Sequence, residues 1–213
     1  MLPDSATLTL FVTAAFIMLI TPGPAVTYII ALSLERGRTL GLLSVLGIQT
    51  ATLCHVLGAA LGLSGLLLSS ALAFNVVKYA GAAYLIYLGI RKFLQRDAAA
   101  SHSLFHGKNR WQIYREGFLV CILNPKPALF FFAFLPQFVD VRRGHVTLQI
   151  LTLGLIFFFM AMITDGTYAL AAGTAGQWLR HHRGFMRAQR YVSGGMYIGL
   201  GLFTALADVR RSK

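Results

Sequence analysis

The chain is organised as long apolar runs separated by short polar segments. Six of these runs have about the 20 residues that a helix needs to cross the hydrocarbon core of a bilayer. The runs cover about Leu8–Leu34, Gly41–Leu68, Val76–Leu94, Gly117–Val139, Leu148–Ala172 and Tyr191–Ala207. Because lipid cannot satisfy free backbone N–H and C=O groups, each run is predicted to be helical. The pattern therefore predicts an all-α integral membrane protein with six transmembrane helices.

Two proline clusters interrupt the first and the fourth runs. The clusters are Thr21, Pro22, Gly23 and Pro24 in the first run and Asn124, Pro125, Lys126 and Pro127 in the fourth. Proline removes a backbone donor and clashes with the preceding turn, so both helices are predicted to break there. Freed carbonyl oxygens bind cations, and the N-terminus of the resumed helix favours carboxylates. An amino acid carries both charges and suits such a break, while a kink with a packing role alone is the alternative.

Matching features indicate that the chain consists of two related halves. Ile20–Ala25 aligns with Leu123–Ala128 in the first span of each half. In the third spans, Lys78-Tyr79 corresponds to Arg190-Tyr191, and Leu88-Gly89 to Leu200-Gly201. Because each half has three spans, the second half enters the membrane upside down relative to the first. We therefore predict two inverted three-helix repeats, at about 8–94 and 116–208, joined by a cytoplasmic linker at about 95–115.

Composition leaves little room for a water-soluble domain. Hydrophobic residues make up 56% of the 213 residues and charged residues 12%, which is about half of the charged fraction of a typical soluble domain. We therefore expect lipid to be the main solvent and residues 1–213 to form a single transmembrane domain. The two cysteines, Cys54 and Cys121, fall within apolar runs, where neither a disulfide framework nor a metal site is expected.

The net charge of +12 is concentrated in the gaps between the apolar runs. The gaps after spans one, three and five hold more Lys and Arg than the other gaps and the termini. The positive-inside rule therefore places these gaps in the cytoplasm and both termini outside, although the basic tail Arg210–Lys213 argues against this orientation. Nucleic-acid binding is not expected, because no groove-reading or stacking motif accompanies the charge.

Two ionisable residues lie deep inside predicted spans. A charge at such depth is costly unless it faces a cavity or a partner. Lys126 could bind a substrate carboxylate or pair with an acid, and snorkelling to the interface is the alternative. Asp165 could exchange a proton during a transport cycle, bind a substrate ammonium group, or pair permanently with Lys126.

Polar residues of the second span are weaker candidates. Gln49, Thr50 and Thr52 lie there, with His55 one turn further on, and a lone buried histidine is more often a packed, hydrogen-bonded group than a proton relay. Asn124 is expected to bond freed carbonyls near its break. The predicted substrate and ion pathway comprises Thr21, Pro22, Gly23, Pro24, Gln49, Asn124, Pro125, Lys126, Pro127 and Asp165.

At these residues the chain resembles the LysE/RhtB family of amino-acid exporters. The resemblance rests on Phe16–Thr27, on Lys78–Gly89, and on Asn124-Pro125-Lys126 followed by Phe134–Phe138; Gly47–Thr50 and Asp165 also fall where that family places polar residues. It implies a multi-pass protein of the bacterial inner membrane that exports amino acids or close derivatives, driven by the proton gradient. Protons, an amino acid and membrane lipid would then be its partners, with no cofactor.

Two other function classes, a membrane-embedded enzyme and a non-transporting scaffold, fit the sequence less well than a secondary exporter. A membrane-embedded enzyme needs a nucleophile and a base within reach, but Ser44 and His55 are separated by roughly 16 Å along one helix at 1.5 Å per residue. A non-transporting scaffold would need neither matched breaks nor ionisable residues in the membrane. The sequence has no phosphate-binding Gly-Lys loop, so ATP drive is not expected. Glycine-rich helix faces would permit a homodimer.

Overall fold

The computed structural model describes residues 4–63 and 107–174, together with isolated helical positions at 75–76, 79–80, 82–83, 86–87, 90, 94, 198–199, 202 and 205. Regular secondary structure in these residues is helical throughout. The predicted third and sixth spans lie largely outside the described residues, as do Lys78, Leu88-Gly89, Arg190-Tyr191 and Leu200-Gly201 of the proposed repeat and most of the linker. The all-helical membrane class is therefore confirmed, while the six-helix inverted repeat stays a prediction.

Two helices are long and apolar enough to cross a membrane without interruption. Helix α3 (Arg38–Gly58) continues through a π-helical turn, η1 (Ala59–Leu63), and helix α8 (Val146–Thr174) has 29 residues. At 1.5 Å per residue, α8 is about 44 Å long, which exceeds the roughly 30 Å of a hydrocarbon core. These helices correspond to the predicted second and fifth spans.

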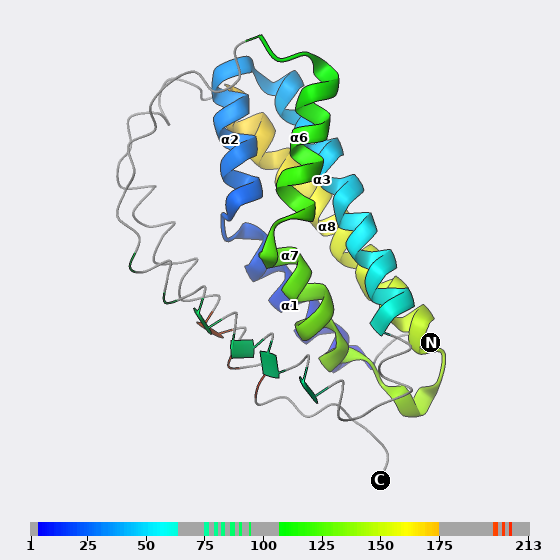
Figure 1. Ribbon diagram of the computed structural model, residues 1–213. Coiled ribbons are helices and arrows are strands. Elements are labelled where there is room, and N and C mark those ends of the chain that lie inside the picture. Colours follow the sequence, from blue (N-terminus) through cyan, green and yellow to red (C-terminus); the bar gives the residue numbers. More distant parts are fainter. Residues whose placement is uncertain are drawn as a thin grey trace.

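Two further segments are bent at the proline clusters, as predicted. Helices α1 (Ser5–Ile20) and α2 (Pro24–Arg36) meet at 47°. Helix α6 (Arg110–Ile122) meets α7 (Pro125–Leu129) at 44°, and α7 continues through a π-helical turn, η2 (Phe130–Phe134), and a 3-10 turn, η3 (Leu135–Phe138). Each second half begins with proline at its first position, where the missing N–H is tolerated. Figure 1 shows both bends.

The fourth segment begins earlier than its predicted start at Gly117. Asn109 and Gln112 form a capping box, in which the Asn109 side chain accepts from the Gln112 N–H and the Gln112 side chain accepts from the Asn109 N–H, both at 2.9 Å. The capping box provides acceptors for two backbone N–H groups that have no partner within the helix. Helix α6 therefore begins at Arg110. A short 3-10 turn, η4 (Val141–Arg143), leads from η3 to α8.

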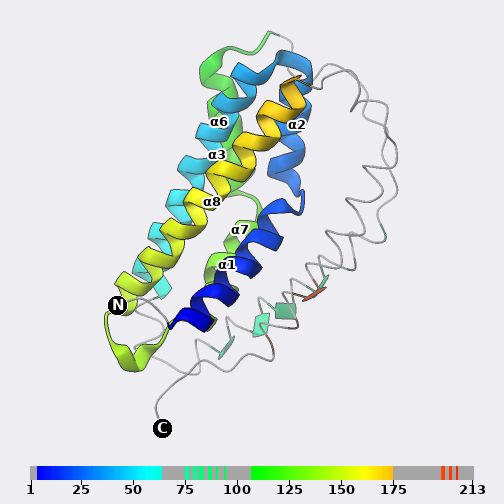
Figure 2. The same ribbon diagram turned by 180° about the vertical axis from the view of Figure 1, so that it is seen from behind.

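Helices α3 and α6 approach closely at two glycines. A Cβ atom built on Gly47 would overlap the carbonyl oxygen of Tyr114, and one built on Gly117 would overlap the carbonyl oxygen of Ser44. Small residues allow this approach in lipid, where dispersion contacts between helices replace the hydrophobic effect as the main driving force. Seen from behind, α8 runs beside both α3 and α2 (Figure 2). Helices α2, α3, α6 and α8 thus form the packed part of one end of the bundle.

Gly47→Ala is expected to destabilise the protein by about 1–3 kcal/mol, because the added methyl group has to displace the backbone of α6. The measurement is the thermal unfolding midpoint of the purified protein in detergent. Gly62→Ala is the matched control, since a Cβ atom there meets no atom within 4 Å in the described part of the chain. Equal midpoints for the two variants would contradict the close approach of α3 and α6.

Aromatic side chains fill the other end of the bundle. The core there is built by α1, by η2 and η3, and by α8, and its ring contacts include Phe130 with Phe157 at 4.5 Å and Phe11 with Phe138 at 5.3 Å between ring centroids. The two proline breaks therefore lie between a mainly aromatic end, beside α1 and α7, and the end formed by α2 and α6 (Figure 1).

Candidate functional site

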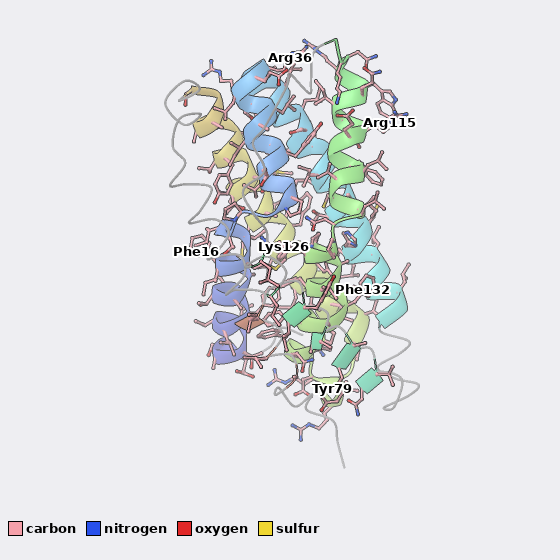
Figure 3. The ribbon with its side chains drawn as sticks, turned by 60° about the vertical axis from the view of Figure 1, so that its left-hand side comes forward. Phe16, Arg36, Tyr79, Arg115, Lys126 and Phe132 are labelled. Carbon is pink, nitrogen blue, oxygen red and sulfur yellow. The ribbon has the colours of Figure 1, made fainter. Side chains whose placement is uncertain are left out.

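The two breaks meet around a small cavity in the interior of the bundle. The cavity has a volume of about 50 Å³. Its walls come from both bent segments and from α3 and α8: Met18, Leu19, Gly23, Ala25, Val26, Ile48, Thr52, Cys121, Asn124, Lys126, Pro127, Phe157, Ala161 and Asp165. Figure 3 shows Lys126 near the middle of the molecule, between the two bent segments. Five predicted pathway residues thus line one cavity: Gly23, Asn124, Lys126, Pro127 and Asp165.

The first break exposes carbonyl oxygens that side chains from other helices bind. The Lys126 ammonium group donates a hydrogen bond to the carbonyl oxygen of Thr21, and the Tyr168 hydroxyl donates to the carbonyl oxygen of Ile20 at 2.7 Å. The Thr21 hydroxyl turns back and donates to the Ile17 carbonyl at 2.7 Å. The cation at the freed carbonyls is therefore the protein's own lysine in this structure.

Lys126 is buried, with 7% of its surface exposed. It is the second residue of α7, and it extends across the cavity to the first break. The structure therefore places its ammonium group in the interior of the bundle. Through this one side chain the two proline clusters are in direct contact.

Asp165 is equally buried, on the face of α8 that lines the cavity, with 5% of its surface exposed. Its carboxylate accepts a hydrogen bond from the Gln49 amide at 2.9 Å. The amide oxygen of Gln49 is buried without a hydrogen-bond partner in the described part of the chain. Among the described residues, Asp165 and Lys126 are not within the 4.0 Å of an ion pair. A basic and an acidic side chain thus line one cavity without forming an ion pair.

The second break is satisfied mainly from within its own segment. The side-chain oxygen of Asn124 accepts from the Lys126 N–H at 3.0 Å, and the backbone N–H of Asn124 donates to the Cys121 carbonyl at 3.0 Å. The expected bond from Asn124 to a freed carbonyl is therefore made by its backbone, while its side chain caps α7. Pro22, Pro24 and Pro125 act through the backbone, by shaping the two breaks.

The weaker candidates of α3 differ in their positions. Thr52 lines the cavity, with its hydroxyl 3.6 Å from the Cys121 sulfur. Thr50 accepts a hydrogen bond from the Tyr114 hydroxyl at 2.9 Å, away from the cavity. His55 is packed against Phe131, and its Nε2 atom lies 3.4 Å from the Cys121 carbonyl oxygen. His55 is thus the packed, hydrogen-bonded histidine that the sequence favours.

Sequence reasoning missed two groups near this site. Tyr168 lies one turn after Asp165 on the same helix, and that spacing was the available signal. Glu116 lies just before the expected start of the fourth span, so it was not considered as a membrane residue. Its carboxylate accepts from the Tyr28 hydroxyl of α2 at 3.1 Å and pairs with Lys108 at 2.8 Å. These contacts join α2 to α6 at the end of the bundle away from the aromatic core.

Metal binding finds no support in the described residues, where no three His, Cys, Asp or Glu side chains gather in a way that could hold an ion. The chemistry that the cavity offers is electrostatic: an ammonium group, a carboxylate and an unpartnered amide oxygen, surrounded by apolar side chains. Such an arrangement is complementary to a small molecule that carries both a negative and a positive charge.

Comparison with known proteins gives the family. The family model described as LysE type translocator matches residues 16–208. The chain belongs to this family. An uncharacterized membrane protein of Vibrio cholerae is 30% identical over 197 residues, covering 92% of this chain and 95% of the relative. The homoserine/homoserine lactone efflux protein of Salmonella typhimurium is 29% identical over 188 residues, covering 88% and 90%.

Other relatives and the helices of the chain agree on the location. An uncharacterized membrane protein of Bacillus subtilis is 28% identical over 206 residues, covering 92% of this chain and 97% of the relative. No solved structure matches the chain. This LysE type translocator is a multi-pass protein of the bacterial inner membrane, as the resemblance implied.

Proposed function

We propose that this translocator is a secondary transporter that exports amino acids or close derivatives from the cytoplasm in exchange for protons. The observation that carries the proposal is a pair of buried ionisable side chains beside the two breaks, one basic on α7 and one acidic on α8. Lys126 and Asp165 line the same cavity without forming an ion pair. Ionisable groups at membrane depth are costly, and they mark substrate and proton pathways in transporters.

The site is complementary to a zwitterion. Lys126 binds the substrate carboxylate, which replaces the Thr21 carbonyl as the acceptor of its ammonium group. Asp165 binds the substrate ammonium group, and the unpartnered amide oxygen of Gln49 accepts a second hydrogen bond from it. Charge-assisted hydrogen bonds of this kind are shorter and stronger than neutral ones.

Asp165 also provides the coupling to protons. Lys126 is too far away for an ion pair, and a charged Asp165 is unfavourable in this apolar surrounding. In the proposed cycle its carboxyl group is therefore neutralised either by the substrate ammonium group or by a proton. Release of the amino acid outside then requires Asp165 to take up a proton, which it releases to the cytoplasm before the next substrate binds. Because Asp165 binds either the substrate ammonium group or a proton, the protein exchanges the amino acid for a proton.

We assign the structure to a state of this cycle in which the cavity is too small for substrate. A cavity of about 50 Å³ has room for only a few waters by this measure, so one end of the bundle has to open to admit an amino acid. Under the orientation given by the positive-inside rule, the end formed by α2 and α6 faces the cytoplasm. There the contacts of Glu116 with Tyr28 and Lys108 have to separate for substrate entry.

Transport by purified protein in proteoliposomes tests the proposal. We expect a pH gradient to drive movement of at least one labelled amino acid from a panel that begins with homoserine, because a relative is named for homoserine and homoserine lactone efflux. Collapse of the gradient with a protonophore and liposomes without protein are the controls. Absence of transport for every amino acid and amino-acid lactone in the panel would refute the proposal.

A membrane-embedded hydrolase is less well supported by the geometry. The Ser44 hydroxyl donates to the Gly41 carbonyl of its own helix at 2.7 Å, while His55 contacts the Cys121 carbonyl. The two residues therefore have separate partners and do not form a nucleophile–base pair. A non-transporting scaffold would not need Lys126 and Asp165 in its interior, where burying ionisable groups is costly.

A further inference from the structure

The carbonyl oxygen of Ile20 has lost its helical donor at the first break, where Thr21 and Gly23 have extended backbone. In an α-helix the N–H of residue i donates to the carbonyl of residue i−4, so the donor for Ile20 would be residue 24. Pro24 has no N–H. In the described part of the chain, the Ile20 carbonyl instead accepts from the Tyr168 hydroxyl at 2.7 Å. The Tyr168 side chain of α8 thus donates the hydrogen bond that the backbone of α2 does not make.

Tyr168 touches both halves of the first bent segment. Its hydroxyl holds the last carbonyl of α1, and its ring packs against the hydrophobic cluster that includes Val26 and Ile30 of α2. It lies one turn after Asp165, so the same helix turn carries the carboxylate of the cavity and the donor that holds the break. The angle between α1 and α2 is thereby tied to the position of Asp165.

The two breaks differ in what holds them. The second break is capped by Asn124 of its own segment. The first break depends on side chains from other segments, Tyr168 for the Ile20 carbonyl and Lys126 for the Thr21 carbonyl. In the proposed cycle the substrate carboxylate takes Lys126 away from Thr21, whereas the hydrogen bond from Tyr168 to Ile20 stays.

We propose that Tyr168 is a positioning residue for transport: its hydroxyl supplies the donor that the Ile20 carbonyl loses at the first break, and so fixes this break relative to Asp165. This inference rests on the proposed function for its effect on substrate, but the replaced hydrogen bond is testable without transport. The hydroxyl binds no substrate itself. It holds the Thr21 carbonyl and Gly23, which lines the cavity, in place relative to Asp165.

Tyr168→Phe tests the inference, because it keeps the ring and removes only the donor. In proteoliposomes we expect the KM for labelled L-homoserine to rise about five-fold, the equivalent of one net hydrogen bond, with kcat little changed. In detergent we expect the thermal unfolding midpoint to fall by about 2–4 °C. Tyr114→Phe is the matched control, since it also loses one hydrogen bond, to Thr50, but at a distance from the breaks; it should lower the midpoint and leave the KM unchanged.

Two results would overturn the inference. One is an unfolding midpoint for Tyr168→Phe that equals that of the wild type, and the other is an unchanged KM in this variant. If the wild type transports no amino acid, the proposed function fails, and the unfolding midpoint of Tyr168→Phe still decides whether its hydroxyl stabilises the first break.

Discussion

Asp165→Asn is expected to abolish proton-driven transport, with a loss of about 100-fold or more in the rate at a fixed pH gradient. The amide has the shape of the carboxyl group and can still accept the hydrogen bond from Gln49 at 2.9 Å. It can neither carry a negative charge for the substrate ammonium group nor bind and release a proton. The protein should therefore fold and insert while the exchange stops.

The design of the assay separates the two tasks of Asp165. Exchange of labelled for unlabelled substrate at equal pH on both sides needs substrate binding but no net proton movement. If Asp165 binds the ammonium group as well as the proton, Asp165→Asn loses this exchange together with pH-driven transport. Retention of full pH-driven transport would remove Asp165 from the mechanism. Asp140→Asn is the control, since Asp140 lies next to η4, beside Arg142 and Arg143 and away from the cavity.

Lys126→Met is expected to reduce transport of free amino acids by about 100-fold or more, because it removes the only basic side chain that lines the cavity in the described part of the chain. Methionine has a similar length and is apolar, so it fills the space of the lysine stem. The carbonyl of Thr21 loses the ammonium donor at the same time. The thermal unfolding midpoint in detergent, measured alongside, shows how much of the protein remains folded.

A substrate without a carboxylate provides the internal control for this variant. Homoserine lactone keeps the ammonium group of homoserine but has no free carboxylate, and a relative of this translocator is named for efflux of both compounds. If Lys126 binds the carboxylate, Lys126→Met should lose homoserine transport and retain more of any lactone transport that the wild type shows. An equal loss for the two compounds would mean that Lys126 acts on the breaks and not on the substrate.

The breaks were predictable because proline acts locally. Pro22, Pro24, Pro125 and Pro127 lack a backbone donor in any environment, and the bends of 47° and 44° lie at these prolines. The start of α6 was predicted too late, since the apolar run begins after Arg115 whereas the capping box at Asn109 acts through hydrogen bonds of polar residues. Hydrophobic runs locate the part of a helix that faces lipid, and caps locate where the helix begins.

The amino-acid sequence by itself determined the membrane class, the four described segments and the positions of Lys126 and Asp165 within apolar runs, because each follows from the order of apolar and polar residues along one stretch of chain. Only the tertiary structure decided which groups meet. Lys126 bonds Thr21 across 105 residues, Gln49 bonds Asp165 across 116, and Tyr168 bonds Ile20 across 148. Such pairs depend on how the helices pack, and packing in lipid is set by surface shape, as where Gly47 and Gly117 admit the neighbouring backbone. The fit between two helix surfaces cannot be predicted from the residues of a single span.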